Sequence, residues 1–219
     1  MKKKFVYRNQ EYAYFDHWDG CTRKTERAVE IPLACATYDR HGGERTLELG
    51  NVLSKYFFFE GPYDIVDKFE KGNGVINCDI EDFQPAHLYD SIISISTLEH
   101  IGWDEDPRDP EKATRVIEKL KGFLAPGGEL LVTIPFGYNT YLDNLLTNGT
   151  KLFPEQYYLQ RSLRWPNWKE VSLSDILKRG YKPLSVFLRS EPWDGPEYDT
   201  KNIYSRTITS LVIGGYHAE

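Results

Sequence analysis

The sequence predicts an α/β fold whose sheet is mostly parallel and carries an antiparallel hairpin at its C-terminal end. Four short apolar runs are rich in β-branched residues and are bounded by Gly, Pro, Asp or Asn, as buried strands are. One strongly amphipathic helix lies between the third and fourth runs. A strand, a helix and a second strand form a crossover, which implies a parallel sheet covered on both faces.

The predicted strands can be placed by their boundaries. The four strong ones and a weaker fifth are residues 45–50, 63–67, 89–96 and 129–134, and residues 74–78. Near the C-terminus, residues 185–188 and 207–213 flank a polar stretch with two prolines and a glycine. We expect these last two runs to pair as the antiparallel hairpin at the edge of the sheet.

The helix has clear start and stop signals. Asp109 is the expected N-cap and Pro110 the first helical residue. The apolar positions then recur at helical spacing, at Ala113, Val116, Ile117, Leu120 and Leu124. Residues 125–128, with the sequence Ala-Pro-Gly-Gly, cannot continue a helix, so we expect a tight turn there that leads into the strand at Glu129.

Two aromatic-rich segments lie outside this pattern. Residues 1–44 contain several tyrosines and a helix-like stretch, and we expect an N-terminal helical segment that acts as a lid. Residues 136–171 have no clean period and are expected to form an insertion that covers one end of the sheet. Aromatic side chains there pack a core or line a pocket for a sugar ring or a flat acceptor.

Composition excludes several classes of protein. The 219 residues carry 27 Lys and Arg against 33 Asp and Glu, a net charge of −6, and basic residues gather only at 2–4, so nucleic acid is not an expected partner. No apolar run is long enough for a bilayer, and no secretory signal is expected. Three cysteines without metal-ligand spacing predict reduced thiols, a cytoplasmic protein and no metal site. Residues 103–106 form an acidic segment that could bind a divalent ion together with His100, but we expect a solvated loop there instead.

The candidate ligand-binding residues follow the predicted strands. In a parallel sheet, ligands bind outside the carboxyl ends of the strands, and those ends carry Glu48 and Gly50, then Asp67, then Asp79, then residues 94–100. Asp67 lies 67 − 48 = 19 residues after Glu48, close to the offset at which a dinucleotide fold places its ribose-binding acid. Only one glycine follows the first strand, so a nucleoside-like ligand fits better than a dinucleotide or ATP.

Ordered motifs over about residues 45–135 resemble a known family. They are Glu48-x-Gly50, Asp67, Cys78-Asp79-Ile80, Tyr89-Asp90 leading to Ser96-Thr-Leu-Glu-His100, and Leu124-Ala-Pro-Gly-Gly-Glu-Leu-Leu-Val-Thr-Ile-Pro135. This order is similar to that of class I S-adenosylmethionine-dependent methyltransferases. The resemblance implies a Rossmann-like three-layer αβα sandwich with a seven-stranded sheet and a final antiparallel strand. It makes residues 45–219 the methyltransferase domain and S-adenosylmethionine the cofactor.

The resemblance also assigns roles by position. Gly50 would lie against the methionine moiety with Glu48 beneath it, Asp67 would accept the ribose hydroxyls, and Asp79 would hold the adenine amino group. The apolar neighbours of the base would be Ile80 and Ile95. The sequence departs from the family at residues 50–54, Gly-Asn-Val-Leu-Ser, where the family has three alternating glycines. Each position also has a structural alternative, because Gly50 suits a turn and the two aspartates suit caps.

The predicted function is methyl transfer to an oxygen or nitrogen of a small molecule, with a sugar or nucleotide-sugar as the leading candidate. His100 is the expected general base, and packing or capping of its loop is the structural alternative. Two other functions stay open: a catalytically silent cofactor-binding domain, which the reduced glycine motif favours, and a nucleotide-dependent oxidoreductase, which the same motif disfavours. The sequence does not indicate an oligomeric state.

Overall fold

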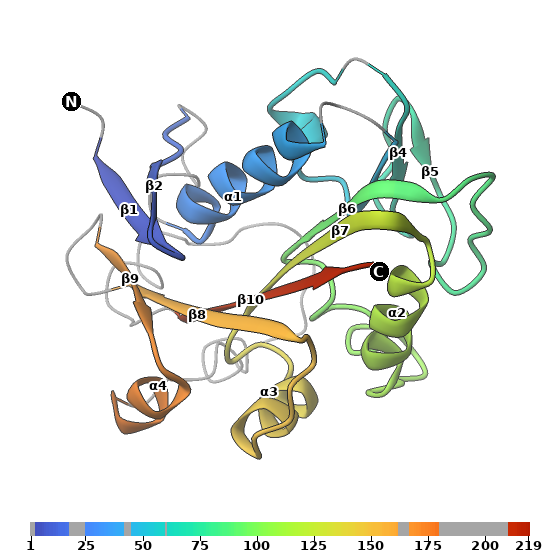
Figure 1. The fold of residues 1–219 in the computed structure, drawn as a ribbon. Helices are drawn as coiled ribbons and strands as arrows, with labels where there is room; N and C mark the ends of the chain where they lie inside the picture. Colours follow the sequence, from blue (N-terminus) through green and yellow to red (C-terminus); the bar gives the residue numbers. More distant parts are fainter. Residues whose placement is uncertain (1–2, 18–24, 42–44, 60, 162–166, 180–209) are drawn as a thin grey trace. The chain divides into compact units, whose positions relative to one another are not determined.

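The computed structural model describes residues 3–17, 25–41, 45–59, 61–161, 167–179 and 210–219 (Figure 1). In chain order its elements are β1 (Lys4–Tyr7), β2 (Gln10–Ala13), α1 (Arg27–Arg40), β3 (Thr46–Leu49), the 3-10 helix η1 (Leu53–Lys55), β4 (Tyr63–Val66), β5 (Val75–Ile76), β6 (Tyr89–Ile95), α2 (Lys112–Lys121), β7 (Leu124–Pro135), α3 (Thr140–Thr147), β8 (Glu155–Arg161), β9 (Trp168–Val171), α4 (Leu173–Arg179) and β10 (Ser210–His217). No helix among these residues is both long and apolar enough to cross a bilayer.

The chain divides into two compact units. Unit 1 comprises Met1–Pro32, Pro135–Thr150 and Tyr157–Val212, and unit 2 comprises Leu33–Ile134, Lys151–Gln156 and Ile213–Glu219. Unit 2 holds the strand ends to which the sequence assigns the cofactor, from Glu48 to His100. In unit 1, the β1–β2 hairpin packs beside β9, and the backbone N–H of Trp168 donates to the Tyr14 hydroxyl at 3.0 Å.

The main sheet confirms the predicted α/β class. Among the described residues its strand order is β5-β4-β3-β6-β7-β10-β8-β9, which is eight strands where seven were expected. β3 is parallel to β4 and β6, β4 is parallel to β5, and β6 is parallel to β7. Ala218, just after β10, exchanges hydrogen bonds with Gly127 and Gly128 near the start of β7, so β10 runs antiparallel to β7.

The central strands are covered on both faces. All four residues of β3 are buried, as are the five residues 91–95 of β6, so neither of the alternating faces is open to solvent. The apolar stripe predicted for α2 is buried, with Ala113, Val116 and Leu120 each at 0% exposure.

The helix boundaries differ from the prediction. α2 begins at Lys112, after a turn at residues 110–111, and ends at Lys121. The Asp109 carboxylate lies 2.6 Å from Arg115 Nη2, so the predicted N-cap is engaged in an ion pair with the first turn of the helix. At the other end the Gly122 N–H bonds to the Glu118 and Leu120 carbonyls and terminates the helix before Leu124.

The turn predicted at residues 125–128 is wrong. These residues belong to β7, which is twelve residues long. Its pairing with β6 is irregular, because Tyr89 pairs with Leu124 while Ser91 pairs with Glu129. The extra residues form a bulge in which Gly127 has φ +79°, a conformation suited to glycine, so the Pro-Gly-Gly sequence bends a strand instead of connecting two elements.

The antiparallel end of the sheet is built from different residues than expected. β10 confirms the second C-terminal run, whereas the predicted strand 185–188 lies outside the described residues, as does Cys21. β8 and β9 form the antiparallel pair, with Tyr158 opposite Val171. Both strands come from residues 136–171, where the sequence shows no period, and α3 is also found there.

The N-terminal segment starts with a strand hairpin. β1 and β2 pair through a two-residue turn at Arg8 and Asn9, which have φ +50° and +60°. Positive φ at both central positions is the geometry of a tight hairpin turn, which usually contains glycine. Because arginine and asparagine occupy it here, the sequence lacks the usual signal for this hairpin.

Candidate functional site

The candidate site lies where the strand order of unit 2 reverses. From β3 the chain continues outward to β4 and β5, and then returns to the other side of β3 to form β6 and β7. Such a switch point leaves a crevice between the carboxyl ends of the two adjacent strands, and ligands of open α/β sheets bind there. Leu49 pairs with Ser94, so the loops that begin at Gly50 and Ser96 leave the sheet side by side.

Gly50 is required by its backbone and by its neighbour. Its φ is +91°, and its N–H donates to the Val66 carbonyl at 2.9 Å. A Cβ at this position would overlap Oγ1 of Thr97 and lie 3.0 Å from its Cβ and Cγ2. Ser96 has φ +42°, which is uncommon outside glycine, and it turns the chain toward this crossing. The two loops therefore approach each other at a point where a side chain on residue 50 has no room.

Glu48 lies under the loop that follows β3. Its side chain is buried, Oε1 accepts the N–H groups of Val52 at 2.8 Å and Leu53 at 2.6 Å, and Oε2 accepts the Tyr63 hydroxyl at 2.9 Å. Burial raises the pKa of Glu48, while these donors act in the opposite direction. Glu48 thus fixes the start of η1 and occupies the N–H groups that a phosphate-binding loop would present to an anion.

Asp67 connects the ends of β3 and β4. Its Oδ1 accepts the N–H groups of Phe69 at 2.8 Å and Glu70 at 2.7 Å, and its Oδ2 accepts the Asn51 N–H at 3.2 Å. A carboxylate has about four acceptor positions. Among the contacts of the described residues, Oδ2 uses one, which leaves an acceptor position on the oxygen that faces the loop after β3.

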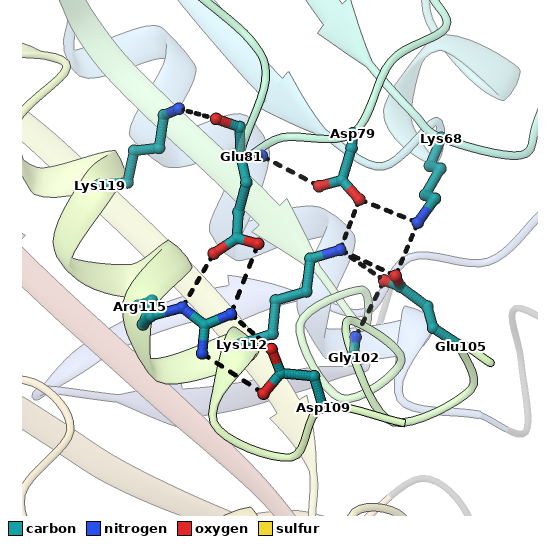
Figure 2. Close-up of polar contacts among 9 residues, drawn as sticks. All are labelled: Lys68, Asp79, Glu81, Gly102, Glu105, Asp109, Lys112, Arg115 and Lys119. Atoms are coloured by element: carbon teal, nitrogen blue, oxygen red, sulfur yellow. Dashed lines mark hydrogen bonds and ion pairs between the residues drawn. The ribbon is translucent and has the colours of Figure 1, made fainter. Parts of the chain in front are cut away.

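Asp79 is held by two lysines, as Figure 2 shows. Its Oδ2 lies 2.9 Å from Lys68 Nζ and 2.5 Å from Lys112 Nζ, and its Oδ1 accepts the Glu81 N–H at 3.0 Å. Burial by itself would raise the pKa of Asp79, but the two ammonium groups outweigh it and hold this pKa well below the usual range. The side chain is therefore a carboxylate at neutral pH and can only accept hydrogen bonds.

The predicted apolar residues are both buried. Ile80, next to Asp79, is 4% exposed, and Ile95, the last residue of β6, is 1% exposed. Ile95 also accepts a hydrogen bond through its carbonyl from Thr97 Oγ1 at 3.0 Å. This bond links the end of β6 to the side chain that meets Gly50.

His100 is oriented by Asp104, a residue of the acidic loop that the sequence places beside His100 only as a possible metal ligand. Its Nδ1 lies 2.6 Å from Oδ2 of Asp104, and its Nε2 lies 3.7 Å from Oε1 of the buried Glu99. The side chains of His100 and Asp104 are each 42% exposed. A carboxylate on one ring nitrogen selects the tautomer that leaves the other nitrogen as a base. The spacing of four residues between His100 and Asp104 was the signal in the sequence that could have indicated this pair.

The acidic loop 103–106 is only partly exposed to solvent. Glu105 is mostly buried and lies 2.6 Å from Lys68 Nζ and 2.8 Å from Lys112 Nζ. Within the described part of the chain, no group of three or more His, Cys, Asp or Glu side chains is placed to hold a metal ion.

Unit 1 contains a separate cavity of about 450 Å³. Its lining includes the aromatic side chains of Phe5, Tyr14 and Trp168 and the amides of Asn9 and Asn167. None of the predicted site residues lines it. The strand-end chemistry therefore belongs to unit 2, and the cavity is a feature of the hairpin and β9.

Contacts between residues distant in sequence complete the site. The structure brings Gly50 to Thr97, Asp67 to Asn51 and Asp79 to the loop that carries His100. Lys112 was not predicted as a site residue. Asn51, Lys68 and Thr97 lie in the strand-end segments and Asp104 lies in the acidic loop 103–106, but none of the four was assigned a cofactor-binding or catalytic role. Lys112 is 33 residues from Asp79, and nothing in the local sequence marks that contact.

Comparison with known proteins gave structural neighbours only. No family model matches the chain, and no curated protein sequence matches it. Among solved structures, the N-methyltransferase NodS from Bradyrhizobium japonicum WM9 is 13% identical, with 88% of this chain and 96% of that chain covered and a TM-score of 0.42. A putative methyltransferase from Thermoplasma acidophilum is 12% identical, with 99% and 81% covered and a TM-score of 0.40.

A third neighbour is coclaurine N-methyltransferase bound to N-methylheliamine and SAH, at 18% identity and a TM-score of 0.35. The match covers 57% of this chain and only 40% of that enzyme.

Proposed function

We propose that this chain is a class I S-adenosylmethionine-dependent methyltransferase that acts on an oxygen or nitrogen of a small molecule, with sugars and nucleotide-sugars as the first acceptors to test. The observation that carries the proposal is the crossing of Gly50 and Thr97 at the switch point, flanked by the acidic ends of β3 and β4. The free thiols of Cys35 and Cys78 support a cytoplasmic location for this reaction.

The chemistry of the loop after β3 favours this cofactor over a dinucleotide. A pyrophosphate needs free backbone N–H groups and a positive environment. Here the N–H groups of Val52 and Leu53 are bonded to the buried carboxyl group of Glu48. A ligand with a cationic sulfonium and an amino group suits such an acidic site electrostatically, whereas a pyrophosphate would meet a carboxylate. The same argument disfavours a nucleotide-dependent oxidoreductase.

The residues of the site fit the parts of the cofactor as follows. Asp67 has an acceptor position on Oδ2 for a ribose hydroxyl, and Asp79 is an ionised acceptor for the adenine amino group. Ile80 and Ile95 are apolar and buried beside these strand ends. Gly50 leaves the backbone open to close approach, with Glu48 fixed beneath it.

S-adenosylmethionine supplies an electrophilic methyl group, so the protein's task is alignment and handling of a proton. Holding an acceptor atom in line with the methyl carbon at about 3 Å supplies most of the rate enhancement. In the proposed mechanism His100 takes the acceptor's proton on Nε2 while Asp104 accepts the Nδ1–H and stabilises the imidazolium that forms.

A catalytically silent cofactor-binding domain is the second candidate, because one observation favours it. Val52 and Ser54 stand where the family has glycines, and the backbone N–H of Val52 is bonded internally to Glu48. Binding of S-adenosylhomocysteine without transfer to any acceptor would select this function.

Calorimetry tests the identity of the cofactor. S-adenosylmethionine and S-adenosylhomocysteine should bind the purified protein, while NAD, FAD and ATP should give no comparable heat because Glu48 occupies the donors that a phosphate needs. Tight binding of NAD would overturn the assignment.

The substitution Asp67→Asn tests the ribose contact. The asparagine side chain keeps an oxygen for the Phe69 and Glu70 N–H groups, but its amide nitrogen cannot accept a bond in the place of Oδ2. We expect a loss of about 1.5–3 kcal/mol in the binding free energy of S-adenosylhomocysteine, measured by calorimetry.

The matched control for this variant is Asp90→Asn, which removes a charge from the opposite end of the sheet. Asp90 lies near the start of β6 and pairs with Arg45 at 3.0 Å. It should leave the affinity unchanged. If a folded Asp67→Asn protein binds S-adenosylhomocysteine as tightly as the unmodified protein, Asp67 only caps backbone N–H groups and does not contact the cofactor.

A further inference from the structure

Four charged side chains in unit 2 form what we call the charge cluster: Lys68, Asp79, Glu105 and Lys112 (Figure 2). Each lysine bridges both carboxylates. Lys68 Nζ lies 2.9 Å from Asp79 and 2.6 Å from Glu105, and Lys112 Nζ lies 2.5 Å from Asp79 and 2.8 Å from Glu105. The cluster is therefore neutral overall, with two positive and two negative charges.

The cluster joins the segments that carry the proposed site residues. Lys68 directly follows Asp67, Asp79 is itself the proposed acceptor for adenine, and Glu105 lies five residues after His100 in the loop that follows β6. Glu105 also accepts the Gly102 N–H at 3.0 Å, which fixes its loop. Lys112 is the first residue of α2, so the helix is tied to both loops through one ammonium group.

The inner part of the cluster is shielded from water. The side chains of Lys112, Glu105 and Asp79 are 7%, 14% and 16% exposed, while Lys68 is 37% exposed. Burial by itself would lower the pKa of Lys112, but its bonds to Asp79 and Glu105 outweigh burial and raise it. Buried charges of this kind are stable only with their partners in place, so loss of Lys112 leaves two carboxylates with one lysine between them.

Further residues of α2 hold the segment next to Asp79. Arg115 Nε lies 3.0 Å from Glu81 Oε1, Arg115 Nη2 lies 2.6 Å from Asp109, and Lys119 Nζ donates to the Glu81 carbonyl. Lys112, Arg115 and Lys119 are spaced by three and four residues, so they share one face of the helix. Glu81 in turn donates its N–H to Asp79 Oδ1. The helix thus fixes both oxygens of Asp79, one directly and one through Glu81.

We propose that Lys112 is a positioning residue for recognition of the purine base. With Lys68 it occupies Oδ2 of Asp79. Oδ1 accepts only the Glu81 N–H among the described contacts, so this oxygen keeps an acceptor position for an exocyclic amino group. This inference rests on the proposed function. A fixed carboxylate accepts from the amino group of adenine, whereas the oxo group of hypoxanthine offers it a second acceptor, which is unfavourable. Lys112 would therefore set base specificity without contacting the ligand.

The test compares two ligands on three proteins by calorimetry. The unmodified protein should bind S-adenosylhomocysteine at least about tenfold more tightly than S-inosylhomocysteine. In Lys112→Met, which nearly keeps the length of the side chain and removes its charge, this ratio should fall by about tenfold or more, toward one. The matched control is Lys121→Met on the same helix, where Lys121 pairs with Glu118 at 2.7 Å, and it should keep the full ratio.

The ratio of the two affinities distinguishes a positioning role of Lys112 from a merely structural one, because a general loosening of the fold would weaken the binding of both ligands to the same extent. A folded Lys112→Met protein that keeps the ratio overturns the proposal. If Lys112→Met does not fold, Lys68→Met removes the other, more exposed cation, and an unchanged ratio there has the same meaning. Failure of the unmodified protein to bind S-adenosylhomocysteine at all overturns the proposed function itself, an outcome distinct from either variant result.

Discussion

Replacing Gly50 with alanine is expected to lower the affinity for S-adenosylhomocysteine by about 100-fold or more and to destabilise the fold. An L-residue in the left-handed region costs about 1–2 kcal/mol, and the new Cβ would also overlap Oγ1 of Thr97. Thr97 would have to rotate away and lose its 3.0 Å bond to the Ile95 carbonyl. About 1.4 kcal/mol of lost binding free energy corresponds to a tenfold loss of affinity. Calorimetry measures the change in affinity, and thermal unfolding measures the change in stability.

The matched control is Gly149→Ala. Gly149 has φ +85°, and a Cβ added there would meet no atom within 4 Å, so alanine at this position bears the backbone strain without the overlap. It should lose stability but keep cofactor affinity. In the double variant Gly50→Ala with Thr97→Gly the overlap is removed, and part of the affinity should return. Full affinity in the single Gly50→Ala variant would mean that the ligand does not lie at this crossing.

Replacing His100 with alanine is expected to lower turnover by about 100-fold or more while cofactor affinity stays nearly the same. This is the usual scale of general-base catalysis. His100 is held by Asp104 at 2.6 Å, so loss of the ring removes the proposed proton acceptor without disturbing the strand ends. Turnover is measured after an acceptor has been found in a panel of sugars and nucleotide-sugars, then phenols, then small amines.

The pH dependence of turnover distinguishes this role from packing. Protonation of His100 removes the base, so turnover should fall as the pH is lowered. The Asp104 carboxylate favours the imidazolium, so Asp104→Asn should move this acid limb to lower pH and reduce turnover less than His100→Ala does. His217→Ala, at the last position of β10, should change neither. Full turnover in the His100→Ala variant would mean that His100 is not a general base and that catalysis depends on alignment of the acceptor with the methyl group alone.

The parallel strands were predictable because each is a compact apolar run that ends at a chain-reversing or acidic residue. β3, β4 and β6 fall within one residue of the predicted limits. The hairpin at Arg8 and Asn9 and the pair β8–β9 were not predictable in the same way. Their turn residues and burial depend on tertiary partners such as Glu170, which accepts the Arg8 N–H at 3.1 Å. The bulge at Gly127 resembles a turn in sequence because both need glycine.

The candidate site was predictable at the strand ends and not beyond them. A parallel sheet brings its carboxyl ends to one edge, so Glu48, Asp67 and Asp79 follow from strand positions alone. What each acid is bonded to depends on residues far away in sequence. Tyr63 reaches Glu48 across 15 residues and Lys112 reaches Asp79 across 33 residues, and no local pattern encodes either contact.

The shortness of β5 bears on how this protein avoids unwanted association. An edge strand exposes a row of unpaired backbone groups on which another chain can add a strand, and long flat edges are sites of aggregation. β5 forms one edge of the main sheet and consists of Val75 and Ile76 alone. Two residues offer too little backbone for a stable added strand. Although Ile76 is 39% exposed, this edge is protected against growth of the sheet by its length.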